Sequence, residues 1–84
     1  MIFFKMDTLN KAQSLSRICE KYGDKMEVDV MNSRYRVNGA SILGLISLLG
    51  TTIEIIPLTD DYLLKTYFLR DVEKIGAYEV KLDG

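Results

Sequence analysis

One serine in this chain could act both as a helix cap and as a site of modification. Ser41 follows the turn residues Asn38-Gly39 and opens an apolar run that continues to Leu49. A serine before such a run caps a helix, because its side-chain oxygen accepts hydrogen bonds from the free backbone N–H groups of the first turn. A phosphate on that oxygen would meet the same N–H groups and the positive end of the helix dipole. Two interpretations therefore stay open: a cap alone, or a cap that is also a phosphorylation site.

The remaining reactive residue types do not form a catalytic or metal-binding pattern. The chain has no histidine, so no imidazole is present for acid–base catalysis, phosphoryl transfer or metal binding. Cys19 falls on the apolar side of a predicted helix, which favours a buried thiol over a nucleophile. Asp60 and Asp61 precede another predicted helix, where adjacent carboxylates complement the helix dipole. We therefore predict a protein that is not an enzyme and that has no metal site and no cofactor.

Length and composition limit the class of protein. At 84 residues the chain is the size of a single domain, spanning residues 1–84 around one core. A net charge of −1 with interspersed signs lacks the basic footprint of a nucleic-acid-binding protein. No apolar run reaches the roughly 20 residues that a membrane span requires, so we expect no membrane partner. One cysteine and the absence of a signal-peptide pattern predict a cytoplasmic protein.

Hydrophobic periodicity predicts the elements of the first half of the chain. Residues 2–6 are typical of a strand, and Asp7 or Thr8 caps the helix that follows. Two further strands, 26–30 and 34–37, are expected to pair as a hairpin. Its opposing charges are Glu27 and Asp29 on one strand and Arg34 and Arg36 on the other. The inward positions of the helix, at spacings of three and four, are Leu9, Ala12, Leu15, either Ile18 or Cys19, and Tyr22.

The second half continues with a helix, a strand, a helix and a tail. The apolar run after Ser41 predicts a short helix ended by Gly50, with Leu45, Leu48 and Leu49 inward and Leu43 well round from them. A strand is expected over residues 53–56, and Pro57 places its end at an edge or exit. Thr59 then caps a helix whose apolar stripe includes Phe68 and Val72. The alternating tail, 77–82, is typical of one more strand, which could pair at a sheet edge or with another chain as a homodimer.

The predicted order is β-α-β-β-α-β-α with a possible extra C-terminal strand. Helices packed on one face of a mostly antiparallel sheet make an α+β open-faced sandwich. The nearest rival by pattern is a ferredoxin-like fold, which would suit a small-molecule-sensing or dimerisation module. That alternative requires a pocket at a sheet edge, for which Gly39 or Gly50 would leave room.

The residues from 38 to 48, Asn-Gly-Ala-Ser-Ile-Leu-Gly-Leu-Ile-Ser-Leu, resemble a known segment. They are similar to the region around the regulatory serine of HPr, the small phosphocarrier of the bacterial sugar phosphotransferase system, and of its relative Crh. In that family a serine opens a short helix whose apolar residues dock onto partner proteins. The resemblance implies an HPr-like fold, with Ser41 at the regulatory position and Ile42, Leu43 and Ile46 as docking residues.

The family's phosphocarrier loop is not matched. In HPr a histidine after the first strand carries the phosphoryl group, with an arginine and a proline close behind. Aligning the helix end at Lys21-Tyr22 puts Thr8 near the histidine position, and Asn10 and Lys11 near the arginine and proline. The loop is also shorter here. A threonine hydroxyl with no activating base is not a comparable acceptor, so the resemblance implies a divergent member without histidine phosphotransfer.

Together these features predict a regulatory or adaptor domain that binds protein partners through the helix Ser41–Ile46. By resemblance, the partners are phosphotransferase-system or catabolite-control proteins, and a kinase of the HPr kinase type acts on Ser41. We expect Leu43 and Ile46 to be the more exposed residues of this helix. Gly44 is expected to mark a close backbone approach, since glycine inside a helix otherwise costs about 1 kcal/mol.

Overall fold

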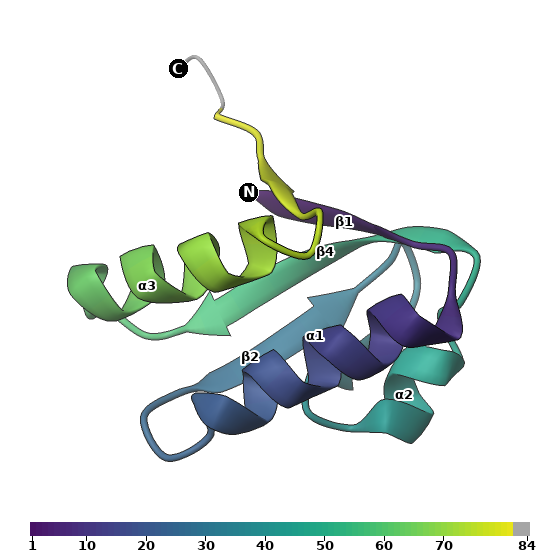
Figure 1. Ribbon diagram of the computed structural model, residues 1–84, viewed down its shortest axis with the longest axis horizontal. Helices are drawn as coiled ribbons and strands as arrows, with labels where there is room; N and C mark the ends of the chain where they lie inside the picture. The colour runs from purple at the N-terminus through teal and green to yellow at the C-terminus, as the bar shows by residue number, and fades with distance from the viewer. Residues whose placement is uncertain (82–84) are drawn as a thin grey trace.

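An antiparallel sheet with helices packed against one face makes up the computed structural model, which describes residues 1–81 (Figure 1). Helices α1 and α3 lie side by side across the strands, and α2 sits beside the first half of α1. The elements in chain order are β1 (Ile2–Met6), α1 (Leu9–Lys21), β2 (Glu27–Met31), β3 (Arg36–Asn38), α2 (Ile42–Ile46), β4 (Thr51–Leu58), α3 (Tyr62–Glu73) and β5 (Tyr78–Glu79). This order confirms the predicted α+β open-faced architecture.

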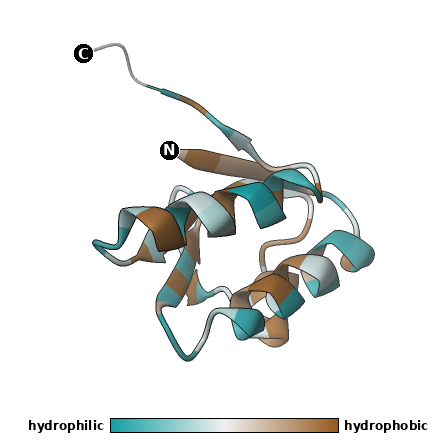
Figure 2. Cartoon of the chain, turned by 60° about the vertical axis from the view of Figure 1, so that its left-hand side comes forward, coloured by the Kyte–Doolittle hydropathy of each residue, from teal (hydrophilic) through white to brown (hydrophobic). Residues whose placement is uncertain are grey.

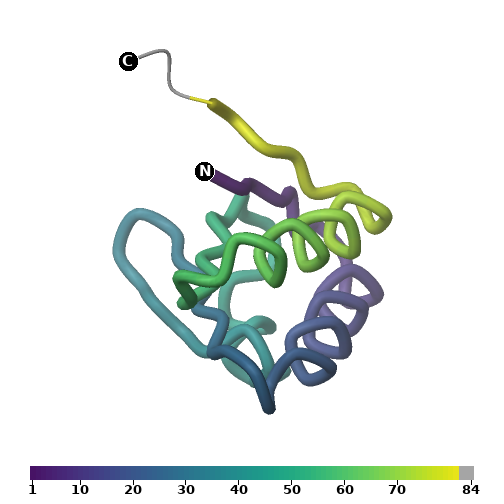
Figure 3. Tube along the Cα trace, turned by 90° about the vertical axis from the view of Figure 1, so that its left-hand side faces the viewer, coloured from purple at the N-terminus to yellow at the C-terminus, as the bar shows by residue number. Residues whose placement is uncertain are grey.

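The strands lie in the order β3-β2-β4-β1-β5, and all neighbours are antiparallel. The predicted extra strand is confirmed as β5, which pairs with β1 at the edge of the sheet. Beyond it, the backbone N–H of Val80 donates to the carbonyl of Met1 over 2.7 Å, so the start of the chain and the segment after β5 run side by side (Figure 3). Leu82, the last residue of the predicted strand, lies outside the described residues.

The core lies between the sheet and the helices because alternate strand residues and one stripe of each helix are apolar. Figure 2 shows the result along the helices, which carry both hydrophobic and hydrophilic residues. Burying each large apolar side chain contributes on the order of 1.5–3 kcal/mol. The largest fully buried side chains include Phe4, Met6, Leu15, Leu45, Ile53 and Phe68. No helix among residues 1–81 has the length and apolar character to cross a bilayer.

Two helix caps decide between sequence alternatives. Thr8, not Asp7, caps α1: its Oγ1 accepts from the backbone N–H of Lys11 over 3.2 Å. The prediction that Thr59 caps α3 is wrong. Asp61 caps that helix by accepting from the N–H of Leu64 over 3.2 Å, while the Thr59 hydroxyl accepts from the N–H of Asp61. A chain of two local hydrogen bonds therefore starts α3 two residues later than expected.

The β2–β3 hairpin pairs later than predicted. The side chain of Asn32 accepts from the backbone N–H groups of Arg34 and Tyr35, which takes both residues into the turn. Of the two predicted charge pairs, Arg36 and Asp29 form one at 2.6 Å. Arg34 is kept in the turn and makes no ion pair within residues 1–81. Tyr35 is exposed for the same reason.

Leu9 differs from expectation and is exposed, since the buried residues of α1 begin at Ala12. Pro57 agrees with the predicted exit: it is the next-to-last residue of β4 and pairs with Val28 of β2. On its other side β1 pairs only as far as Ile55, so a proline without an N–H is tolerated at this point of a central strand.

Gly39 is the glycine at which an added Cβ would come closest to a neighbouring atom. Its N–H donates to the carbonyl of Val28 over 2.7 Å, and a Cβ built on it would lie 2.7 Å from the Sγ of the buried Cys19. No real carbon atom tolerates that distance, so the connection before α2 can approach α1 only through a glycine.

We expect Gly39→Ala to lower the free energy of unfolding by about 1–3 kcal/mol, because the added methyl group overpacks against Cys19. Combining it with Cys19→Ala should recover part of this loss, since the sulfur is then gone. Urea unfolding of the wild type, both single variants and the double variant measures the coupling. Strictly additive losses would contradict the contact.

Candidate partner-docking site

Ser41 caps α2 and is open to solvent. Its Oγ accepts from the backbone N–H of Gly44 over 3.3 Å. The turn before it is held by Asn38, whose Oδ1 accepts from the N–H of Ala40 over 2.8 Å and whose carbonyl accepts from the N–H of Ser41 over 3.1 Å. The hydroxyl therefore lies at the head of the helix with its bond to one N–H formed, and the predicted cap is confirmed.

The apolar residues of α2 and of the turn that follows it divide between two faces. Leu45 and Leu48 are fully enclosed, and Leu49 is half-buried. By contrast, Leu43 is 78% exposed and Ile46 is 40% exposed, while Ile42 is half-buried between the two sets. The predicted exposure of Leu43 and Ile46 is confirmed. We call Ser41, Ile42, Leu43 and Ile46 the α2 surface.

Gly44 allows α2 to lie against β3. A Cβ at this position would be 3.1 Å from the Cβ of Val37, closer than ordinary van der Waals contact. The helix is too short to be stable alone and depends on this packing for its orientation. The predicted close approach is confirmed. Because Gly44 packs against Val37 of β3, the neighbouring Leu43 points toward solvent.

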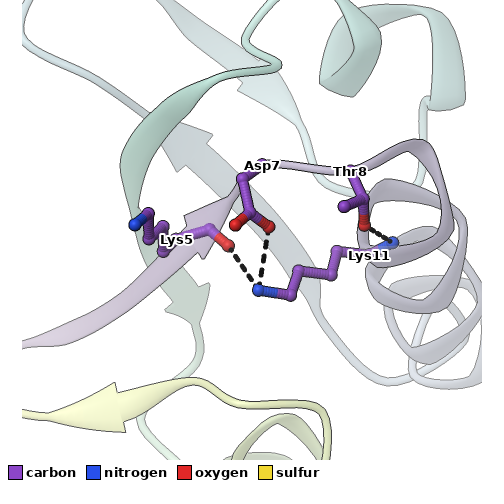
Figure 4. A network of polar contacts seen from close by, with 4 residues as sticks. All are labelled: Lys5, Asp7, Thr8 and Lys11. Atoms are coloured by element: carbon purple, nitrogen blue, oxygen red, sulfur yellow. Dashed lines mark hydrogen bonds and ion pairs between the residues drawn. The ribbon is translucent and has the colours of Figure 1, made fainter.

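The loop after β1 is closed by its own polar groups (Figure 4). Lys11 reaches back from α1, and its Nζ lies 2.9 Å from Oδ1 of Asp7 and 3.3 Å from the carbonyl of Lys5. The hydrogen bond and charge of Lys11 hold the pKa of the Asp7 carboxyl below its usual value. The hydroxyl of Thr8 already accepts the capping hydrogen bond of α1, and Asn10 is exposed in the first turn of that helix.

This geometry has a chemical consequence for the three residues near the family's phosphocarrier positions, Thr8, Asn10 and Lys11. The nearest carboxylate, Asp7, is paired with a cation, so it is a poor base for the Thr8 hydroxyl. Among residues 1–81, no group of three or more Cys, His, Asp or Glu side chains comes together as a metal site would require.

One polar cluster escaped the sequence analysis. The hydroxyl of the buried Tyr22, on α1, donates to Oδ2 of Asp71, on α3, over 2.6 Å, and Nζ of Lys21 lies 3.2 Å from the same oxygen. Burial and the Asp71 bond raise the pKa of Tyr22 to about 12. The Tyr22 and Lys21 hydrogen bonds hold the pKa of Asp71 below its usual value. The partners are 49 and 50 residues apart, so no local pattern marks them.

The pocket required by the rival hypothesis is not beside either glycine. The space beside Gly39 is occupied by Cys19. At Gly50 nothing lies within 4 Å of a Cβ, and this residue has a φ of +87° in the turn after α2. A hollow of about 530 Å³ does lie at the sheet edge between β4, β5 and α3. It is lined by Ile55, Ile56, Pro57, Tyr62, Leu69 and others, of which none belongs to α2.

We expect Tyr22→Phe to lower the free energy of unfolding by about 1–2 kcal/mol at neutral pH, because Asp71 loses a hydrogen bond to its charged form. A depressed folded-state pKa adds stability above the unfolded value of 3.8 that is lost as the pH falls through the folded value. The cost of the substitution should therefore shrink in acid. The raised pKa of Tyr22 adds stability that is lost as the pH rises toward about 12, so the cost should also shrink there.

Urea unfolding across the pH range measures this difference, and carboxyl NMR should show the pKa of Asp71 rising in the variant. Tyr35→Phe is the matched control, because that ring is exposed in a turn. A cost that is constant from acid to alkaline pH would contradict the assignment.

No protein-family model matches the sequence, and no curated protein matches it either. Among solved structures, the chain is similar to the crystal structure of HPr-C-His from Thermoanaerobacter tengcongensis, with a TM-score of 0.66 and 15% sequence identity. The match covers 89% of this chain and 89% of the other. At that identity the likeness concerns the fold, and it decides against the ferredoxin-like rival. The chain therefore has an HPr-like fold.

Proposed function

We propose that this chain is a non-catalytic regulatory or adaptor domain of the HPr-like type, which binds a protein partner through the α2 surface. The observation that carries the proposal is the position of Leu43. It is 78% exposed on a helix whose opposite side is buried in the core. Exposed apolar residues next to one another mark interaction sites more often than isolated ones do, and Ile46 lies one turn along from Leu43.

The α2 surface is preorganised for binding. Leu45, Leu48 and the contact between Gly44 and Val37 hold the helix in place before any partner arrives. A rigid surface loses little conformational freedom on association, so more of the burial energy becomes affinity. Enclosing a leucine side chain contributes on the order of 1.5–3 kcal/mol. The exposed hydroxyls of Ser41 and Ser47 give the apolar residues a polar rim.

Ser41 is proposed to regulate this surface by phosphorylation. Its hydroxyl is exposed and lies two residues before Leu43. A phosphate would add about two negative charges beside the apolar residues while remaining compatible with the free N–H groups at the helix start. The modification would therefore change which partner binds rather than unfold α2. The HPr-like fold and the resemblance of residues 38–48 support a kinase of the HPr kinase type.

The proposed partners are phosphotransferase-system or catabolite-control proteins in the cytoplasm. This assignment rests on the resemblance of the α2 surface to the docking region of HPr and Crh. The closed loop after β1 supports a role without phosphoryl transfer, because Thr8 caps α1 and Asp7 is paired with Lys11.

We expect Leu43→Ser to change the free energy of unfolding by less than about 0.5 kcal/mol, because the side chain is mostly in water already. The same change should weaken binding to a catabolite-control protein at least about tenfold, since the apolar contact is lost. Calorimetry measures the affinity and urea unfolding the stability. Leu45→Ala is the contrasting variant, with an expected cost of about 2–5 kcal/mol. Unchanged affinity of Leu43→Ser for all HPr-type partners would exclude the α2 surface.

Incubation with HPr kinase and ATP should phosphorylate Ser41, as mapped by mass spectrometry of peptides. Ser41→Ala should abolish the modification, and Ser47→Ala, at the other end of α2, should not. Ser41→Asp should alter affinity for the same partners, and equal affinity across them would remove the switch. In a parallel reaction, phosphoenolpyruvate and the general phosphotransferase enzyme should transfer no phosphate, because the chain has no histidine.

A further inference from the structure

A basic groove lies between the end of α1 and the face of α3. It has a volume of about 410 Å³. We call it the α1–α3 groove and define it by Lys21, Lys25, Leu64, Tyr67, Arg70 and Lys74. Tyr22 and Asp71 complete its lining. Four of the eight residues are cations and one is a carboxylate, although the whole chain has a net charge of −1.

The carboxylate in the groove is already engaged. Asp71 accepts from the Tyr22 hydroxyl and pairs with Lys21, and the charge of Lys74 also acts on it, so this single negative charge faces four positive charges. The other three cations, Lys25, Arg70 and Lys74, make no ion pair within residues 1–81. Three like charges gathered in one concavity repel each other, and an anionic ligand would relieve that repulsion.

The groove continues into a second hollow, of about 530 Å³, at the start of α3, which shares Lys25, Leu64 and Tyr67 with the first. It adds Leu63, which is 63% exposed, beside Tyr67, which is 54% exposed. Thr59 and Asp61 also line it, and both are hydrogen-bonded to backbone N–H groups at the start of α3. Figure 3 looks onto this end of the molecule, where α1 ends and α3 begins. The two hollows together offer cations along one part and apolar side chains along the next.

We propose that the α1–α3 groove binds an acidic peptide segment of a partner protein, with an apolar residue next to its carboxylates. The carboxylates would contact Lys25, Arg70 and Lys74, and the apolar side chain would pack on Leu63 and Tyr67. Charge complementarity argues for the acidic character. The two hollows, of about 410 and 530 Å³, share three lining residues and together extend from Lys74 to Leu63.

The openness of the groove favours a peptide over a small molecule. Most of the side chains that line it are exposed, among them Lys25, Tyr67 and Arg70. Small-ligand sites bury most of the ligand surface, which an open groove cannot do, whereas an extended segment gains contacts along its length. No residue of α2 lines either hollow, so this surface is separate from the α2 surface.

The test titrates the full chain, labelled with nitrogen-15, with a short synthetic peptide of aspartates and glutamates around a leucine pair. The expected result is a set of amide shifts confined to the end of α1 and the exposed side of α3. Arg70→Glu with Lys74→Glu should weaken binding at least about tenfold, because attraction becomes repulsion. Replacing the leucine pair of the peptide by serines should also weaken binding, and Leu43→Ser should leave it unchanged.

Arg34→Glu is the matched charge-reversal control, because Arg34 is exposed in the β2–β3 turn and lines neither hollow. Urea unfolding of each variant checks that the fold is retained, and Lys25→Glu offers an independent variant if α3 is weakened. Shifts located on α2, or equal weakening by Arg34→Glu, would overturn the proposal. So would no binding, or tighter binding of inorganic triphosphate or a single-stranded oligonucleotide than of the peptide.

Discussion

The α2 surface depends on one packing constraint. The segment from Gly39 to Gly44 lies very close to α1 and β3. Gly39 fits against Cys19 of α1 only because it lacks a Cβ, and the Oγ of Ser16 donates to the carbonyl of Ala40 over 2.9 Å. Gly44 makes the second tight contact, against Val37. These contacts hold the start of α2, a helix of five residues, against α1 and β3. Its outward residues are therefore determined by packing on the opposite side, and not by their own preferences.

The connection between β1 and α1 is short, and its side chains pair with one another. In place of a long open loop there are two residues, Asp7 and Thr8, between β1 and α1. Lys11 folds back over them, and its Nζ also lies 5.9 Å from the centre of the Phe4 ring. The side chains of Asp7, Thr8 and Lys11 all have hydrogen-bond or ion-pair partners within this connection.

Helix α1 connects the two surfaces that the proposals concern. Its inner side meets the α2 connection at Ser16 and Cys19, and its end meets α3 through Lys21 and Tyr22. The Tyr22 ring packs edge-on against Phe68 with the centroids 5.3 Å apart. The hydroxyl of the same residue holds Asp71 at the base of the groove. Tyr22 thus serves the core with its ring and the charge pattern of the surface with its hydroxyl.

The sequence by itself determined the element types, the α+β architecture, the Ser41 cap and the outward position of Leu43, because periodicity, capping and glycine placement are local properties. The predicted start of α3 and the predicted hairpin turn were both wrong. Asp61 caps α3 and Asn32 accepts from the N–H of Arg34, although neighbouring residues have side chains that could make the same kind of hydrogen bond. The sequence did not reveal the α1–α3 groove. Tertiary structure alone brings Lys21 and Lys25 together with Arg70 and Lys74, because residues so distant along the chain meet only when two helices pack on one sheet.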